Sequence, residues 1–370
     1  MNKVAFIILA FLFSFIILDA CKKRELEIPE TPEIPDTSTV PNEPYELSYG
    51  GLPEPIIPSD NPLTVQGVKL GRMLFYETLL SKDNSISCGS CHSQETAFTD
   101  TRRFSLGVRN LPGGRQAMTV FNMLWNRNEF FWDGRAHLLR DQSLMPIQDE
   151  LEMDETLQNV VDKLQATDMY PQQFKNAFGT DEISSELMSL ALEQFMNSIV
   201  SYNSKYDQYL DGKASLSTEE ERGRFLFFTE YNPSFPNASG ADCQHCHGGS
   251  NFENDKYMNN GLDDDASITD IGRENVSGNA ADKAKFKVTS LRNIELTPPY
   301  MHDGRFATLE QVVDHYDKVK SSSTLDPSFQ QQLPNGLQLS SSDKAALVAF
   351  LKTLTDNQLI TDTIYSDPFD

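Results

Sequence analysis

Cysteine, histidine and tryptophan are scarce in this sequence, and basic residues are outnumbered. Its 370 residues include 5 Cys, 6 His and 2 Trp, and 54 acidic residues against 31 basic ones give a net charge of −23. So acidic a chain repels phosphate backbones, which argues against nucleic acid as a partner. Hydrophobic residues make up 39% of the chain, which excludes collagen, coiled coils and wholesale disorder. The length is typical of about two domains.

The sequence also lacks the roughly 20 consecutive apolar residues that a membrane-spanning helix needs. Its apolar run over residues 4–18 is typical of a signal-peptide core, and the residues at 18–21, Leu-Asp-Ala-Cys, are similar to a bacterial lipobox. We therefore expect residues 1–20 to be a lipoprotein signal peptide. Acyl chains on Cys21 would anchor the protein to a membrane of the cell envelope, in the periplasm. The alternative is an ordinary secretory peptide followed by a stray thiol.

Residues 21–60 are rich in proline and in acidic, serine and threonine residues. This composition favours extended conformers over a packed core, so the segment is predicted to be a linker. Its prolines are Pro29, Pro32, Pro35, Pro41, Pro44, Pro53, Pro55 and Pro58.

The other four cysteines form two Cys-x-x-Cys-His motifs. They are Cys88-Gly-Ser-Cys91-His92 and Cys243-Gln-His-Cys246-His247. Two thiols at this spacing can add to the vinyl groups of one haem, and the histidine can then bind its iron. A zinc site would need a fourth ligand, and a thioredoxin-like motif would need a βαβ pattern. The motifs predict two covalently bound haem c groups, which leaves no cysteine for a disulfide.

Further sequence elements recur in the same order in both halves. Gly-Arg-x-Leu-Phe at residues 71–75 and 223–227 precedes each haem motif, and Asp-Gly-Arg at residues 133–135 and 303–305 follows it. An asparagine stands before each Asp-Gly-Arg, at Asn122 and Asn293. The repetition predicts two homologous haem domains that arose by internal duplication.

Local signals are helical throughout. Ser217-x-x-Glu220 and Thr308-x-x-Gln311 are typical capping boxes, and apolar residues recur at helical spacing over residues 157–164 and 347–354. No convincing run of alternating strand residues is present. The fold class is therefore predicted to be mainly α, with two cytochrome c-like haem domains. The amino-terminal domain is expected at residues 61–213 and the carboxy-terminal domain at residues 214–370.

These motifs resemble those of the bacterial dihaem cytochrome c peroxidases and MauG-like enzymes, over residues 61–354. The resemblance implies that the amino-terminal haem, bound by His92, reacts with peroxide. The carboxy-terminal haem, bound by His247, would pass electrons to it, and Trp132 falls at the position of a bridging tryptophan.

The register with the family also assigns catalytic side chains. Gln142 and Glu152 match a distal glutamine and a catalytic glutamate, and Pro146 matches a pocket proline. Cleavage of the O–O bond requires a base that takes a proton from one peroxide oxygen and returns it to the other, and an amide can orient the peroxide. From composition alone, Glu152 would be a solvated acid in the acidic stretch 149–154.

Two departures from the common peroxidase pattern refine the assignment. Residues 93–116 contain no histidine, so the iron of the first haem is expected to be open, or bound by water, without prior reduction. Tyr316 stands where many peroxidases have a methionine ligand, and it is predicted to bind the second haem iron. The alternative is a core tyrosine with an ordinary partner. His315 and Met301 compete as ligands, and His137 and His245 are expected to be ordinary.

The family also implies a calcium ion between the haems. Thr297 and Pro299 match the segment that supplies carbonyl oxygens. The amide ligand would come from Gln116, which is one methylene longer than the family's asparagine.

The leading functional prediction is a peroxidase that reduces hydrogen peroxide with electrons from a small donor protein, such as a cytochrome c or a cupredoxin. The first alternative is MauG-like oxidation of a partner protein's side chains; against it, Ala241 and Asp242 supply no surface tryptophan before the second haem motif. A non-catalytic electron carrier is the second alternative, but it leaves Gln142 and Glu152 unexplained. The resemblance also suggests a homodimer.

Overall fold

The computed structural model describes residues 43–235 and 238–369. The expected signal peptide, Cys21 and the first part of the expected linker lie outside the described residues. Within the described ranges no helix combines the length and the apolar character needed to cross a membrane.

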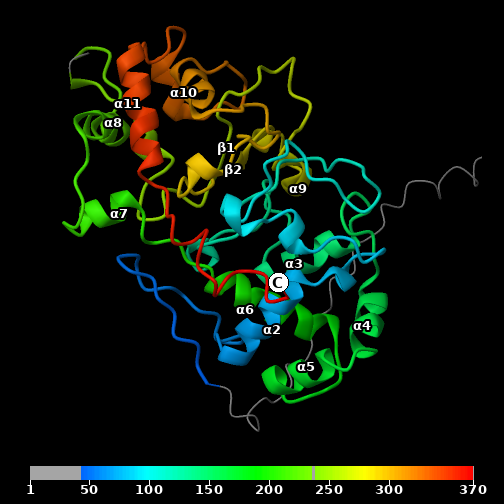
Figure 1. The fold of residues 1–370 in the computed structure, drawn as a ribbon. Helices are drawn as coiled ribbons and strands as arrows, with labels where there is room; N and C mark the ends of the chain where they lie inside the picture. The colour runs from blue at the N-terminus through cyan, green and yellow to red at the C-terminus, as the bar shows by residue number, and fades with distance from the viewer. Residues whose placement is uncertain (1–42, 236–237, 370) are drawn as a thin grey trace, which may run out of the picture.

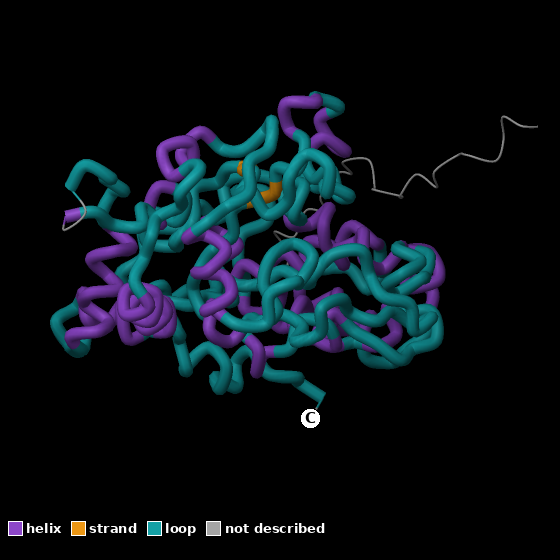
Figure 2. Tube along the Cα trace, turned by 90° about the horizontal axis from the view of Figure 1, so that it is seen from above, coloured by secondary structure: helices purple, strands orange, loops and turns teal. Residues whose placement is uncertain are grey.

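The described chain is mainly helical, as predicted, and long loops join its helices (Figure 1, Figure 2). The two short strands pair antiparallel, with Tyr257 opposite Lys287. The helices and strands are α2 (Val65–Tyr76), α3 (Leu139–Gln148), α4 (Leu157–Gln165), α5 (Tyr170–Phe178), α6 (Ser185–Ser198), α7 (Lys205–Leu210), α8 (Thr218–Phe228), β1 (Tyr257–Met258), α9 (Glu274–Ser277), β2 (Phe286–Lys287), α10 (Leu309–Asp317) and α11 (Ser341–Lys352).

Both predicted capping boxes are present, at the start of α8 and of α10. The apolar residues that were predicted from their helical spacing face the core: Leu157, Val160 and Leu164 are buried on α4. In α11, Leu347, Phe350 and Leu351 are buried. Local capping and periodicity therefore specify these helices.

Each half is built around one close helix pair. In the amino-terminal half α2 packs on α6, and a Cβ atom at Gly71 would lie 1.9 Å from the carbonyl oxygen of Ala191. In the carboxy-terminal half α8 packs on α11, and a Cβ atom at Gly223 would lie 1.9 Å from the carbonyl oxygen of Ala346. Only glycine permits backbones to approach so closely.

Asn122 and Asn293 are fully buried and hold the chain just beyond these pairs. Both have a positive φ, which asparagine tolerates better than most residues. The N–H of Asn122 donates to the carbonyl of Ile199, after α6, and that of Asn293 donates to the carbonyl of Leu354, after α11. The side chains of both asparagines also bond to Ser201, which ties the two halves together.

The packing departs from the expected domain boundaries at both ends of the described chain. The expected linker extends to residue 60, yet Leu52 is part of the amino-terminal core, and Trp125 Nε1 donates to the carbonyl of Pro53 at 2.8 Å. Apolar residues between the prolines, such as Leu52, allow this part of the expected linker to pack against the core.

The segment after α11 also packs on the opposite half of the chain. It was expected in the carboxy-terminal domain, but Leu359 and Tyr365 belong to the amino-terminal core, and the segment runs beside α2 and α6 (Figure 1). The Arg72 guanidinium donates to the carbonyl of Ser366 at 2.6 Å.

Candidate functional site

The first Cys-x-x-Cys-His motif begins in a single 3₁₀ turn at Cys88–Ser90. His92 follows it, and its Nδ1 lies 3.0 Å from the carbonyl oxygen of Phe98. Because a carbonyl only accepts, Nδ1 carries the proton and Nε2 keeps its lone pair. Burial lowers the pKa of His92, which keeps the imidazole neutral. This is the state in which histidine binds a metal.

The second motif repeats this arrangement. His247 follows the 3₁₀ turn Cys243–His245, and its Nδ1 lies 3.1 Å from each of the carbonyl oxygens of Phe252 and Thr289. Burial lowers the pKa of His247 to about 4. Both motifs therefore present a neutral imidazole whose second nitrogen is already oriented.

The cysteines of these motifs are neutral thiols. Burial raises the pKa of Cys88 and of Cys243 to about 12, and the described residues contain no disulfide. Zinc binds thiolates, and among the described ranges no cluster of three or more His, Cys, Asp and Glu side chains is arranged to hold a metal ion. The described residues around the motifs therefore form no closed zinc site.

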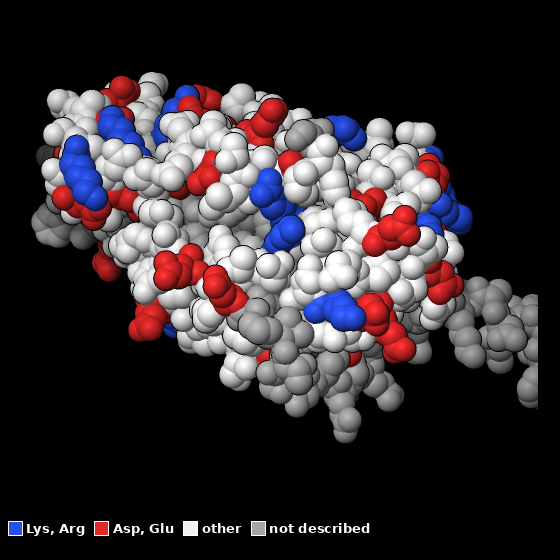
Figure 3. Space-filling view, turned by 60° about the horizontal axis from the view of Figure 1, so that its bottom comes forward, with Lys and Arg blue, Asp and Glu red and all other residues white. Residues whose placement is uncertain are grey.

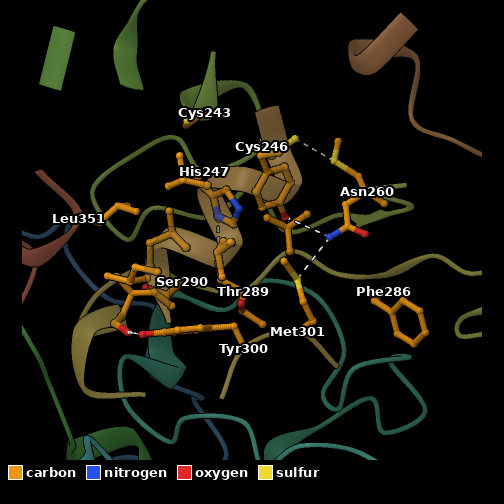
Figure 4. A pocket seen from close by; sticks show the side chains of 18 of the residues that line it. Cys243, Cys246, His247, Asn260, Phe286, Thr289, Ser290, Tyr300, Met301 and Leu351 are labelled. Atoms are coloured by element: carbon orange, nitrogen blue, oxygen red, sulfur yellow. Dashed lines mark hydrogen bonds between the residues drawn. The ribbon is translucent and has the colours of Figure 1, made fainter. Parts of the chain in front are cut away.

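A cavity of about 230 Å³ adjoins the second motif and is lined mainly by apolar side chains. Figure 4 shows Cys243, Cys246 and His247 on one side of this cavity and Met301 and Asn260 on another. An apolar cavity with two thiols and an oriented imidazole in its wall suits a flat macrocycle held through its edge and its iron.

Tyr316 faces the same cavity from α10. Its hydroxyl oxygen accepts a hydrogen bond from Asn260 Nδ2 at 3.1 Å, and burial raises its pKa to about 12. Met301 also lines the cavity. His315 differs, because its Nε2 lies 3.2 Å from the carbonyl oxygen of Asn260 and is engaged with the main chain. The structure thus brings Tyr316 and Met301 into the pocket of His247.

His245 and His137 do not line this cavity. The side chain of His245 is 51% exposed beside Asp242, and that of His137 is 80% exposed beside Glu129.

Trp132 lies at the junction of the two halves and lines the same cavity. Its Nε1 donates to the carbonyl of Gln116 at 2.9 Å, and its own carbonyl accepts from the N–H of Lys287 at 2.8 Å. The indole meets the His302 ring edge-on, with ring centroids 6.4 Å apart. His302 in turn stacks on Phe286 at 3.6 Å.

Glu152 and Gln142 are positioned by α3 and the turn that follows it. Gln142 lies within α3, which contains Pro146, and the N–H of Glu152 donates to the carbonyl of Asp149 at 3.0 Å. Burial raises the pKa of Glu152 to about 7, and the charge of Asp149 adds to this effect. The charge of Glu152 also raises the pKa of Cys88, so this carboxyl group is electrostatically coupled to the first motif.

Comparison with known proteins agrees with this geometry. Residues 65–215 match the family described as di-haem cytochrome c peroxidase. The cytochrome c551 peroxidase of Nitrosomonas europaea is 36% identical over 82% of this chain and 85% of its own length. The MauG protein of Methylorubrum extorquens is 34% identical over 80% of each chain. This chain belongs to the dihaem cytochrome c peroxidase family.

A solved structure supports the same relationship. A MauG-like protein associated with microbial copper homeostasis superimposes with a TM-score of 0.78 and 34% identity, covering 86% of this chain and 97% of that one. This dihaem peroxidase is accordingly an oxidoreductase that uses peroxide, and its cofactors are haem c.

The residues expected to bind calcium in this dihaem peroxidase lie around one cavity, which Gln116, Thr297 and Pro299 all line. Gln116 is buried, and its Nε2 donates to Thr99 Oγ1 at 3.1 Å. Sequence reasoning missed Asp100, whose Oδ2 is buried and has no hydrogen-bond partner among the described residues. Gln116 Nε2 also donates to the main-chain carbonyl of Asp100 at 3.3 Å, so the two residues adjoin, and a buried carboxylate oxygen suits a hard cation.

Two further residues of the dihaem peroxidase carried no sequence signal. Lys287 is buried, and its ammonium donates to Asn128 Oδ1 and, at 2.6 Å, to the carbonyl of Glu129. It thereby joins β2 to the loop that leads to Trp132. The second residue is Asn260, which contacts both Tyr316 and Met301. Neither belongs to a motif, because both act through contacts between segments far apart in the sequence.

Proposed function

We propose that this protein reduces hydrogen peroxide to water with two electrons from an external donor. The balanced reaction takes up two protons and two electrons per peroxide and releases two waters. Electrons would enter at the carboxy-terminal haem and reach the amino-terminal haem through Trp132. The observation that carries the proposal is the raised pKa of Glu152, which places its proton exchange near neutral pH.

In this proposal Cys88, Cys91, Cys243 and Cys246 attach the two haems covalently, and His92 and His247 bind their irons. The bound haem supplies the iron that accepts the peroxide and the electrons needed to reduce it. Glu152 takes a proton from one peroxide oxygen and returns it to the leaving oxygen, while the Gln142 amide orients the substrate. Tyr316 is proposed as the second ligand of the carboxy-terminal haem iron, and a phenolate there favours the ferric state.

Because residues 93–116 contain no histidine, we also propose that the first haem reacts with peroxide without prior reduction. A spectrum of the oxidised protein in which both haems are low-spin and bis-histidine ligated would contradict this.

The two halves contain corresponding helix pairs, α2 with α6 and α8 with α11, and each half has one buried asparagine. This correspondence supports an origin by duplication. We further propose the envelope location, the lipid anchor at Cys21, a calcium ion at Gln116, Thr297 and Pro299, and a homodimer. On the face shown in Figure 3, acidic and basic side chains are interspersed, so charge identifies no docking face there for a donor such as a cytochrome c or a cupredoxin.

The decisive experiment replaces Glu152 by glutamine. Steady-state peroxide consumption with a reduced cytochrome or an artificial donor should fall by about 10²–10⁴-fold, the usual contribution of a positioned acid–base group. Glu150→Gln is the matched control, because Glu150 is exposed in the same turn and should retain activity. Both variants should keep the wild-type haem spectra. Undiminished turnover in Glu152→Gln would refute the role assigned to this residue.

Oxidation of a partner protein is the second candidate function, and Tyr316 together with the 34% identity to MauG favours it. The wild-type protein with and without a partner protein separates the two functions: for the second, peroxide would be consumed slowly with small donors, and oxidised side chains would accumulate on the partner protein. A protein that carried electrons without catalysis would consume no peroxide at all.

A further inference from the structure

Asn260 places one amide nitrogen between two side chains that could serve as ligands in the cavity of the second motif. Its Nδ2 lies 3.1 Å from Tyr316 Oη and 3.5 Å from Met301 Sδ. Figure 4 shows the Asn260 amide with a dashed line to Met301, across the cavity from His247. The phenol and the thioether therefore converge on a single donor.

The main chain that carries the Asn260 side chain is held in place by its surroundings. The main-chain carbonyl oxygen of Asn260 lies 3.2 Å from His315 Nε2. The preceding residue, Asn259, is buried and donates from its amide to Ser322 and Thr324, while its Oδ1 accepts from the N–H of Gly261. A donor fixed in this way needs little reorganisation to act on a ligand atom.

Met301 is also held toward the cavity. Its φ of +74° is rarely adopted by residues with a side chain. Hydrogen bonds on both sides keep this conformation, from Tyr300 N to the carbonyl of Phe306 at 2.7 Å and from Gly304 N to the carbonyl of Met301 at 3.1 Å. Such strain persists where the surrounding structure fixes it, often at functional sites.

The two contacts of Asn260 have opposite consequences for metal binding. An N–H that donates to a phenolate oxygen stabilises the anion, because hydrogen bonds to a charged acceptor are the stronger ones. The same N–H on a thioether sulfur, a weak acceptor, stabilises it little and draws electron density from the lone pairs that a metal would need. We propose that Asn260 is a positioning residue that selects Tyr316 over Met301 as the ligand of the second haem iron. This inference rests on the proposed function, in which Tyr316 is that ligand.

The test uses Asn260→Leu in the full-length protein with both haems bound. Tyrosine ligation favours ferric iron, whereas methionine raises the reduction potential. The absorption and paramagnetic resonance spectra of the oxidised variant should therefore change from a tyrosine-ligated to a methionine-ligated form, and the reduction potential of the second haem should rise. Asn260→Ala serves as a second, smaller replacement and should shift both readouts in the same direction.

Asn254→Leu is the matched control. Asn254 Nδ2 also contacts a thioether, Met258 Sδ at 3.7 Å, and Met258 lines the same cavity. This replacement should leave the spectrum and the potential unchanged. Asn260→Leu combined with Met301→Leu should lose the methionine-type spectrum, which identifies the sulfur that replaced the phenol.

Tyr316→Phe separates this inference from the ligand assignment beneath it. A wild-type spectrum in Tyr316→Phe would overturn the ligand proposal itself. A changed spectrum in Tyr316→Phe, with an unchanged spectrum and potential in Asn260→Leu and Asn260→Ala, would overturn only the role of Asn260. Peroxide turnover tests Glu152 and is independent of both outcomes.

Discussion

At the scale of single residues, neighbouring carboxyl groups after α3 have opposite protonation behaviour. Burial raises the pKa of Glu152 to about 7. Two residues later, hydrogen bonds from Lys82 and Arg109 hold the pKa of Asp154 below its usual value. The same residue class therefore supplies a proton-exchanging group at one position and a permanent anion at the other. A carboxyl group that titrates near neutrality suits acid–base chemistry at physiological pH.

This difference predicts the pH dependence of activity. Because the raised pKa keeps Glu152 protonated below pH of about 7, the group cannot accept a proton there. We expect kcat/KM for peroxide to rise about tenfold per pH unit on the acid side and to level off above the pKa. Initial rates across a pH series give this profile, and Glu152→Gln should remove its acid limb. A limb that persisted in the variant would assign the titration to another group.

At the scale of secondary-structure elements, the two close helix pairs set the shape of each half. Gly71 on α2 and Gly223 on α8 each face a main-chain carbonyl of the partner helix, and a Cβ atom at either position would also lie 2.8 Å from a phenylalanine Cβ of that helix. A backbone carbonyl cannot move aside as a flexible side chain can, so the interface has no room for a methyl group.

Gly223→Ala should therefore destabilise the carboxy-terminal half. Overpacking a tight interface costs about 1–3 kcal/mol, and because the new Cβ atom would lie 1.9 Å from a carbonyl oxygen we expect the upper end of this range, above the gain of about 1 kcal/mol from the better helix former. Denaturant unfolding of the holoprotein measures the change. Gly51→Ala is the control, because a Cβ atom there meets nothing within 4 Å. Equal stability of Gly223→Ala and the wild type would show that α8 and α11 can separate to admit the methyl group.

At the scale of the whole molecule, the two ends of the described chain both pack on the amino-terminal half. Tyr365 is 7% exposed, and its hydroxyl accepts from the N–H of Val200, just after α6. Leu52, from the expected linker, belongs to the same core. The carboxy-terminal segment thus fastens the second half of the chain to the first, in addition to the contacts around Trp132.

Removal of this anchor has a predictable effect. Tyr365→Ala should lower the free energy of unfolding by about 3–5 kcal/mol, as expected for loss of a large buried aromatic side chain. Phe369→Ala is the control, because Phe369 is 49% exposed and should change stability by less than about 0.5 kcal/mol. Thermal or denaturant unfolding measures both. If Tyr365→Ala were as stable as the control, the contact between this segment and the core would contribute little to the free energy of unfolding.

Features that depend on short spacings could be predicted from the sequence. Capping boxes and buried stripes were predicted correctly, because they require side chains three or four positions apart. The haem motifs are similarly local, since each needs only five consecutive residues. The mainly helical fold followed from these signals. The packing of residue 52 and residue 365 could not be predicted, because a proline-rich or terminal stretch shows no periodicity that identifies its partner.

The sequence by itself determined the family, the two haem-binding motifs and the candidate residues around them. Tertiary structure alone decided how those residues behave. The raised pKa of Glu152 depends on its burial in the folded chain, and Asn260 meets Tyr316 across 56 positions of sequence. The physical reason is that spacing fixes contacts within one helix or turn. Burial and hydrogen bonding between remote segments exist only once the chain has folded.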